Sequence, residues 1–437
     1  MNNIFSYLLG VLFVLLGIAV SIGLHEIGHL VPAKKFGVRV TKYMIGFGPT
    51  LWSTKRGETE YGIKAIPLGG YIAISGMFPP DKGAEPKNWF TKWVSEARKS
   101  QRAVDGEYPE SKAFYRLSIP KRIVVMLGGP VMNLFLGVVF TLWALCGIGT
   151  VQNSTQVSQV YCCVPANYTT VQCAPGDPVS PAKQAGLHKG DRILSIGGKS
   201  VATWAEARNQ LDQADGKPVS LSVLRAGKAL SLQITPVMRR VTLFNDQTGA
   251  VVKDSKGKPK TGMRSVLGVS LRGEVAPMSA QGAFETIGQE LTQTGQMILQ
   301  LPQQVTHLAG NLFSGAPRDQ NGPVSIVGIG GIAGTVATSN AIDWTGKLFT
   351  GLMLLGSLNF ALFVFNLVPL LPLDGGHVLN AIYEGIKRST FKLIGRADPG
   401  PADTARMVPF TTAMWAVLMI LSLLIITADL VSPVKLG

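Results

Sequence analysis

Two histidines and the glutamate between them are the residues of this sequence best suited to chemistry. His25, Glu26 and His29 fit the pattern H-E-x-x-H. On a helix, side chains four residues apart lie on the same face. Two neutral imidazoles in that arrangement can bind Zn²⁺, and the glutamate can act as a general base. The spacing therefore predicts a catalytic metal site.

The surroundings of this motif make the prediction more specific. Residues 4–24 form an apolar run without charges, and the run leads directly into His25. An ionisable group at the centre of a membrane helix costs about 2.5–3.5 kcal/mol on insertion scales. A cluster of such groups at that depth needs a compensating function, and a bound metal ion supplies one.

The composition is that of a membrane protein. Of the 437 residues, 46% are hydrophobic and only 15% are charged, whereas a soluble domain has about 25% charged residues. Several apolar runs reach the roughly 20 residues that a membrane-spanning helix needs. These runs cover residues 4–31, 122–149, 347–371 and 408–430. The expected fold class is a polytopic α-helical membrane protein with about four transmembrane helices.

The net charge of +15 indicates a membrane topology and not a nucleic-acid partner, because no nucleic-acid motif is present and the basic residues flank the spans. Most lie in the loops after the first and third spans: Lys34, Lys35, Arg39, Lys42, Lys55, Arg56, Lys121, Arg122, Lys387, Arg388, Lys392 and Arg396. Cytoplasmic loops are rich in Lys and Arg. The even number of spans then places both termini and the polar region 150–345 outside the cell.

The segments between the spans differ in character. Residues 36–121 hold β-rich stretches with glycine pairs, which indicate membrane-associated hairpins, followed by a polar segment. Within an extension at 241–346, residues 280–313 have the apolar spacing of an amphipathic helix. Residues 378–407 are expected to be a cytoplasmic loop. The expected segments, in order, are 1–35, 36–121, 122–149, 150–240, 241–346, 347–377, 378–407 and 408–437.

Residues 150–240 contain a recognisable pattern. Pro181 to Gly198 read P-A-x-x-A-G-L-x-x-G-D-x-I-x-x-I-x-G, which predicts a short helix, a turn and an alternating strand. A helical run at 204–212 and strands at 219–225 and 229–235 follow. The stretch resembles an α+β PDZ domain of the bacterial protease type. The alternative is another small β-rich domain.

A third metal ligand should come from another span, because a catalytic zinc site usually has three protein ligands and a water. Asp374 is the acidic residue expected at that depth. Pro369 and Pro372 break the helix before it, and irregular backbone at membrane depth is tolerated only inside the protein or along a cavity. Asp374 is therefore the expected third ligand. The alternative is an aspartate that caps a helix at the cytoplasmic interface.

Three cysteines lie in the external region, where the compartment permits disulfides. Cys173 can bridge to Cys162 or to Cys163, and the sequence does not decide which. The alternative is a metal ligand set, which the lack of a C-x-x-C spacing disfavours. Cys146 falls within the second span, where a thiol is an ordinary apolar side chain.

These motifs together resemble the site-2 protease family, in its RseP-like bacterial branch. The resemblance rests on H-E-x-x-H in the first span, on Gly129-Pro130-Val131-Met132-Asn133 in the second, and on the PDZ-like domain. The third span adds N-x-x-P-x-x-P-x-D-G, from Asn366 to Gly375. The match covers nearly the whole chain. The single PDZ-like domain and the external cysteines resemble the actinobacterial members.

The resemblance implies an intramembrane zinc metalloprotease in the bacterial inner membrane. It implies His25, His29 and Asp374 as Zn²⁺ ligands and Glu26 as the base. Substrates would be single-span membrane proteins such as anti-sigma factors, already trimmed by another protease, with the PDZ domain as a size filter.

The resemblance also implies residues that bind substrate. Strand addition at the hairpins, with Gly69 and Gly70, would straighten the substrate. Asn133 and Asn366 would face its backbone; the alternative is that each makes an interhelical hydrogen bond.

Two other functions are compatible with a metal site in a membrane. A metal transporter predicts several ligand sites and histidine-rich loops, but this chain has five histidines in all. A membrane-anchored PDZ adaptor with a structural zinc would have no need of Glu26. Of the other histidines, His377 is expected at the interface or as a partner of Asp374, and His188 and His307 on the surface.

Overall fold

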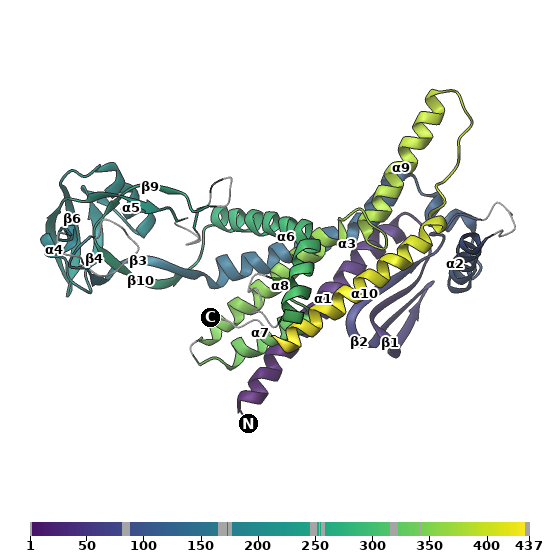
Figure 1. Cartoon of the computed structure of the whole chain (residues 1–437), viewed down its shortest axis with the longest axis horizontal. Helices are drawn as coiled ribbons and strands as arrows, with labels where there is room; N and C mark the ends of the chain where they lie inside the picture. Colours follow the sequence, from purple (N-terminus) through teal and green to yellow (C-terminus); the bar gives the residue numbers. More distant parts are fainter. Residues whose placement is uncertain are drawn as a thin grey trace. The chain divides into compact units, whose positions relative to one another are not determined.

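The computed structural model describes residues 2–80, 88–164, 173, 177–244, 251–252, 254, 258–314, 322–340 and 342–432. The chain forms two compact units, and each is described by itself (Figure 1). The first unit comprises Met1–Ala144 and Ile287–Gly437, and the second comprises Leu145–Thr286. Residues 433–437, the end of the expected last segment, lie outside the described part.

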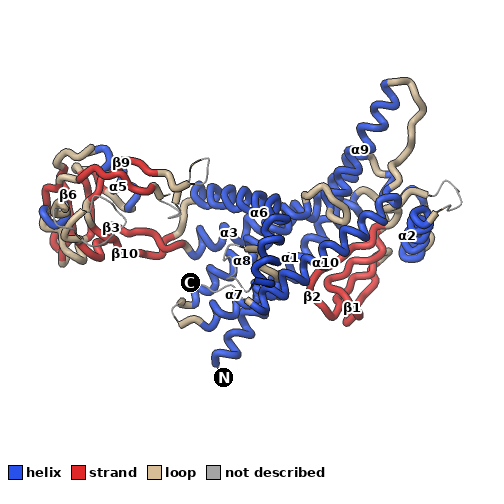
Figure 2. The backbone as a smooth tube through the Cα atoms, in the orientation of Figure 1, coloured by secondary structure: helices blue, strands red, loops and turns tan. Residues whose placement is uncertain are grey.

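Long apolar helices form the frame of the first unit (Figure 2). They are α1 (Asn2–Lys35), α3 (Ile119–Leu142), α8 (Trp344–Asn366) and α10 (Val408–Val431). A π-helical turn, Trp143–Ile148, continues α3. Within the described residues, 4 helices are long and apolar enough to cross a membrane, which confirms the four expected spans.

Small residues allow these helices to pack closely. A methyl group on Gly28 of α1 would lie 2.2 Å from the carbonyl oxygen of Gly128 in α3. A shorter apolar helix, α7 (Ile326–Thr338), packs against the first half of α1. There, a methyl group on Gly10 would lie 2.5 Å from the carbonyl oxygen of Ala333. No larger side chain fits at these positions without moving a backbone.

A curled antiparallel hairpin lies against α1. Its strands are β1 (Val40–Arg56) and β2 (Thr59–Ile74). Residues 42–45 pair with 60–63 on one side and with 70–73 on the other, so each long strand contributes twice to the same sheet. Gly46 and Gly48 have φ angles of +94° and +84°, which glycine adopts without strain and which permit the bend. The hairpins expected within 36–121 are therefore present.

The third span ends earlier than the sequence suggested. α8 stops at Asn366, and α9 (Asp374–Leu393) begins after a turn that contains Pro369 and Pro372. Proline lacks the N–H that an interior helical turn requires, which explains the break. The segment 378–407, expected as a cytoplasmic loop, is helical as far as Leu393. Of its basic residues, Arg388 and Lys392 are exposed and Lys387 is half-buried.

Short helices lie in the connections from β2 to α3 and from α9 to α10. A surface helix, α2 (Trp89–Asp105), precedes two short 3-10 turns, Glu110–Lys112 and Phe114–Arg116. A further 3-10 turn, Thr404–Met407, leads into α10. Arg122 at the start of α3 and Glu384 on α9 form a buried ion pair with an N–O distance of 2.5 Å.

The second unit is built on an antiparallel sheet with the strand order β10-β3-β4-β6-β7. The strands are β3 (Thr150–Val160), β4 (Arg192–Ile196), β5 (Lys199–Ser200), β6 (Val219–Arg225), β7 (Lys228–Ile234) and β10 (Val269–Ala276). Helices α4 (Pro181–Gln184) and α5 (Trp204–Gln213) pack on it. Ile193, Ile196, Leu211 and Leu221 lie at the centre of its apolar core. The helices and strands expected between 181 and 235 are all present.

The expected boundary at residue 240 is wrong. β10 pairs with β3 along its length, from Val269 with Val160 to Ala276 with Thr150. The sheet is therefore completed by a strand that follows a separate hairpin of β8 (Val237–Thr242) and β9 (Thr261–Val266). Pairing between strands this far apart leaves no local trace in the sequence. The expected amphipathic helix at 280–313 corresponds to α6 (Ala280–Ser314).

Candidate metal centre

Three side chains from two helices converge at the carboxyl-terminal part of α1. The Nε2 atoms of His25 and His29 lie 3.2 Å apart. Asp374, the first residue of α9, places Oδ2 at 3.5 Å from Nε2 of His25 and at 3.4 Å from Nε2 of His29. Their ligand atoms all lie within 4.8 Å of one another. The fold thus brings Asp374 next to two histidines from which most of the chain separates it.

A backbone carbonyl sets the orientation of His29. Its Nδ1 lies 2.7 Å from the carbonyl oxygen of Val125 in α3. A carbonyl oxygen can only accept, so Nδ1 carries the proton and Nε2 keeps its lone pair for the shared centre. A second hydrogen bond of this kind is the usual way in which a metal-binding histidine is held.

Glycines make room for the site on both sides. A methyl group on Gly129 of α3 would lie 2.2 Å from Nε2 of His29 and 2.6 Å from Cε1 of His25. On the other side, methyl groups on Gly375 and Gly376 would lie 2.4 Å and 2.5 Å from backbone atoms of the 367–371 turn. The turn can therefore fold against the start of α9 and hold Asp374 toward α1.

The chemistry of the donor set fits a divalent cation. Two imidazole nitrogens and a carboxylate oxygen meet there, and Oδ2 of Asp374 has no hydrogen-bond partner within the described part of the chain. These lone pairs repel one another unless a cation lies between them. Nitrogen and carboxylate ligands from three side chains are the set typical of catalytic zinc.

Glu26 lies beside the ligands and against the sheet. A methyl group on Gly70 of β2 would lie 3.2 Å from Cγ of Glu26 and 2.9 Å from Ile22, so this strand touches α1 directly. Ile72 has its backbone next to the Glu26 carboxylate. The segment 70–74 pairs with β1 along one edge only. The outer edge of this segment, where the backbone of Ile72 meets Glu26, therefore lies next to the carboxylate.

Comparison with known proteins decides the family. The model of peptidase family M50 matches residues 13–396 of this chain. The chain belongs to peptidase family M50, the site-2 protease family. As a member it is an intramembrane zinc metallopeptidase, and Zn²⁺ is its cofactor.

Curated relatives match over nearly their whole length. The zinc metalloprotease Rip1 of Mycolicibacterium smegmatis is 32% identical over 444 residues, which cover 98% of each chain. Rip1 of Mycobacterium tuberculosis is 30% identical over 433 residues, covering 98% of this chain and 99% of its own. A putative zinc metalloprotease of Clostridium perfringens is 26% identical over 424 residues, covering 97% and 99%.

The expected substrate-binding residues of this M50 peptidase fall at different places. Asn133 on α3 is 1% exposed, and its side-chain amide adjoins His25. Asn366 is the last residue of α8. Gly69 and Gly70 belong to β2, and Gly70 alone of the two adjoins Glu26.

Sequence reasoning missed the residues that support this site. Asn359 is fully buried in α8 and donates hydrogen bonds to Ser21 of α1 at 2.9 Å and to the Leu355 carbonyl at 2.8 Å. The interhelical bond considered for Asn133 and Asn366 thus occurs at Asn359. Gly129 was noted only as part of a motif, although glycines in a membrane helix commonly mark close packing. His377 lies on α9 one turn after Asp374 and is half-buried.

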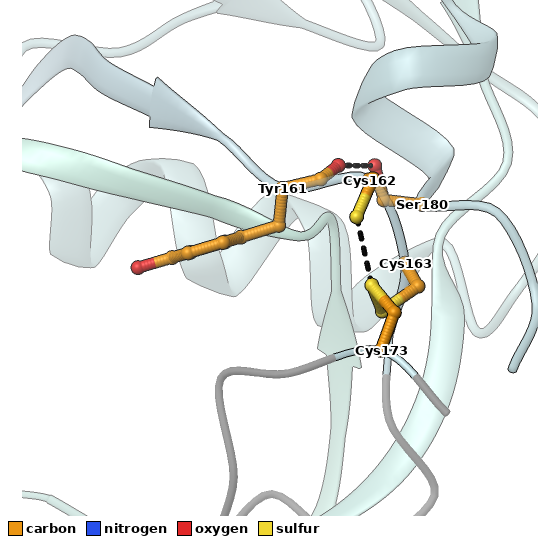
Figure 3. The surroundings of a disulfide bond; sticks show 5 residues. All are labelled: Tyr161, Cys162, Cys163, Cys173 and Ser180. Carbon is orange, nitrogen blue, oxygen red and sulfur yellow. Dashed lines mark hydrogen bonds between the residues drawn. A yellow bond between two sulfur atoms is a disulfide. The ribbon is translucent and has the colours of Figure 1, made fainter.

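Cys162, Cys163 and Cys173 form a compact group in the second unit (Figure 3). Cys163 and Cys173 are disulfide-bonded. Cys162 is a free, exposed thiol, and its Sγ lies 2.7 Å from Sγ of Cys173. Both pairings considered from the sequence thus lie within reach of Cys173, and the structure contains the pairing with Cys163.

Proposed function

We propose that this M50 peptidase hydrolyses peptide bonds within the transmembrane segments of single-span membrane proteins, with His25, His29 and Asp374 as the zinc ligands and Glu26 as the general base. The observation that carries the proposal is the convergence of Asp374 Oδ2 with both imidazole Nε2 atoms, at 3.4 and 3.5 Å. The carboxylate of Glu26 borders the same centre from the neighbouring position on α1.

The chain's own groups divide the chemistry. Zinc, when bound, supplies Lewis acidity that activates water and polarises the scissile carbonyl. Glu26 accepts the proton of the attacking water and returns it to the leaving amine. The Val125 carbonyl keeps the His29 imidazole in the tautomer that offers Nε2 to the metal. Asp374 contributes the negative charge that balances the cation.

Substrate is presented as a strand. A helical segment has its carbonyls hydrogen-bonded within the helix, so it must unwind before attack. Segment 70–74, which includes Gly70, presents its outer edge beside Glu26, and main-chain hydrogen bonds along that edge hold an extended peptide. Gly69 lies on β2 directly before this segment. Asn133, whose amide lies beside His25, and Asn366 supply further hydrogen bonds to the substrate backbone.

The proposed topology places the basic loops in the cytoplasm, and both termini and the 145–286 unit outside. The substrates are then anti-sigma factors or similar single-span proteins that another protease has already trimmed. The 145–286 unit is a PDZ domain that excludes untrimmed substrate by its bulk. The similarity to the zinc metalloproteases named Rip1 supports this assignment.

Glu26→Gln tests the proposal against its two alternatives. The variant should keep bound zinc, measured by metal analysis of the purified protein, and should lose cleavage of a single-span reporter. Asp374→Ala should lose most of the zinc, and Asp374→Glu should keep part of it. If the protein were a membrane-anchored adaptor with a structural zinc, the Glu26→Gln variant would function like the wild type. A transporter predicts zinc flux into vesicles, which a protease does not produce.

A further inference from the structure

Helix α2 carries two exposed tryptophans side by side. Trp89 is 67% exposed and Trp93 is 48% exposed. Their rings are 5.9 Å apart in an edge-to-face arrangement. The opposite face of the helix is covered, with Val94 and Asp105 buried. Exposed indoles of this kind are costly in water but favourable at a membrane surface, where one end of the ring is apolar and the N–H is hydrated.

The position of the two tryptophans relative to a candidate membrane span supports a location at the membrane surface. Between them, Phe90 packs its ring against Phe410 with centroids 6.4 Å apart. Phe410 lies in the first turn of α10, a candidate span, and is 63% exposed. An ion pair of 2.5 Å between Arg98 and Asp403 fixes α2 to the turn before that span. Helix α2 thus lies beside α10, a candidate membrane span (Figure 1).

The charges on the exposed side of α2 indicate which lipids it meets. Lys92, Lys99 and Arg102 are exposed, and Glu96 is the one acidic residue on that side. Glu96 pairs with Lys99 at 3.2 Å, which leaves a positive excess. The cytoplasmic leaflet carries anionic lipids that attract such clusters.

We propose that α2 is an interfacial helix that binds anionic lipid headgroups, with Trp89 and Trp93 in the headgroup layer. Continuity with α10 and the matching charge favour lipid over a protein partner. The lipid is recognised by its negative headgroup and not by a specific pocket.

The far end of α2 connects this lipid contact to the strand beside Glu26. The Asp105 carboxylate accepts a hydrogen bond of 3.1 Å from the backbone N–H of Gly76, two residues after β2 ends. Arg39, at the start of β1, donates a hydrogen bond of 2.9 Å to the Asp105 carbonyl. The first and last residues of the curled sheet, Val40 and Ile74, pair with each other. Helix α2 therefore holds this one end of the sheet, and lipid binding by α2 steadies the sheet that borders the metal centre. This consequence rests on the proposed function.

Quenching by brominated lipid tests the location of the two indoles. The full-length protein and Trp89→Phe/Trp93→Phe are reconstituted into vesicles of equal parts phosphatidylglycerol and phosphatidylcholine. The lipids are either unmodified or brominated close to the headgroup. The fluorescence difference between the two proteins reports these two side chains. It should fall by about half or more in brominated vesicles. An equal difference signal in both kinds of vesicle overturns the proposal.

Charge variants test the choice of lipid. Wild-type cleavage of a trimmed single-span reporter should rise several-fold from pure phosphatidylcholine to the mixed vesicles. Lys92→Gln/Lys99→Gln/Arg102→Gln should remove most of that rise and keep full zinc content. The matched control replaces three exposed lysines of the other unit: Lys189→Gln/Lys199→Gln/Lys228→Gln.

The outcomes separate the two proposals. A control variant that loses the rise equally would show a general charge effect and would contradict lipid binding by α2. Bromine quenching without cleavage of the reporter in any vesicle would support the lipid contact and would instead contradict the proposed cleavage of single-span substrates.

Discussion

Gly129 faces the imidazole of His29 so closely that a methyl group on its Cα would lie 2.2 Å from Nε2. The glycine belongs to α3, and its lack of a side chain leaves the space in which the two histidines and Asp374 meet. The metal centre therefore depends on a residue that has no functional group of its own.

Gly129→Ala should weaken zinc binding by roughly 10–100-fold, the range seen when the surroundings of a metal ligand are disturbed. The added methyl group displaces the His29 ring from the Val125 carbonyl. Zinc titration of the purified protein measures the effect. Gly295→Ala on α6, where a methyl group meets no atom within 4 Å, is the control and should bind zinc normally. Equal affinities in the two variants would refute the steric argument.

Glu384→Ala should destabilise the first unit by about 3–5 kcal/mol, because it leaves the buried Arg122 guanidinium without its partner. The side chains of Arg122 and Glu384 are only 5% and 1% exposed. Urea unfolding in detergent compares this variant with Glu96→Ala, which removes an exposed pair with Lys99 and should cost less than about 1 kcal/mol. Similar losses of unfolding free energy in the two variants would contradict a special stabilising role for the buried pair of Arg122 and Glu384.

The second unit should lose stability in acid through Asp191. Hydrogen bonds from Arg225 hold the pKa of this carboxyl below its ordinary value. Because the pKa in the folded state is lower than in the unfolded state, the contribution is complete above about pH 4 and is lost as the pH falls toward the lowered value. For a fragment of residues 145–286, the urea concentration at the unfolding midpoint should therefore decrease as the pH is lowered below about 4.

Asp191→Asn should be less stable than the wild type at neutral pH by about 1–3 kcal/mol, because the Arg225 charge loses its partner. It should also show a flatter dependence on pH in this range. An unchanged slope in the variant would assign the acid sensitivity to other carboxyl groups.

Either vicinal cysteine should be able to bridge to Cys173. Cys163 does so in the structure, and Sγ of Cys162 lies 2.7 Å from Sγ of Cys173. Cys162→Ser and Cys163→Ser should each keep a reducible bond, whereas Cys173→Ser should lose it. Alkylation followed by mass measurement of the 145–286 fragment counts the free thiols. The fragment also contains Cys146, so three free thiols in Cys163→Ser, in place of one, would show that Cys162 cannot replace its neighbour.

Excision of Thr150–Ala276 tests the proposed size filter. Thr150 pairs directly with Ala276, so a short glycine linker from Gly149 to Pro277 can close the gap without straining either end. The shortened protein should keep its zinc, cleave trimmed substrate as before and cleave untrimmed substrate faster. Loss of trimmed-substrate cleavage with zinc still bound would identify the unit as a docking site.

The sequence by itself determined the features that depend on local pattern. Hydrophobic runs identified the four spans, because a bilayer demands a minimum apolar length. The four-residue spacing of His25 and His29 placed them on one helical face. The prolines of the third span and the need for a third ligand singled out Asp374. The elements between 181 and 235 followed from turn residues and alternation.

Only the tertiary structure decided how distant segments meet. It brought Asp374 within 3.5 Å of residues at the other end of the chain. It also joined β10 to β3 and paired Arg122 with Glu384. Such contacts have no sequence period, because they depend on which surfaces pack together and not on neighbours along the chain. The space left by Gly129 follows from the same cause: an absent side chain acquires a role only when another helix lies against it.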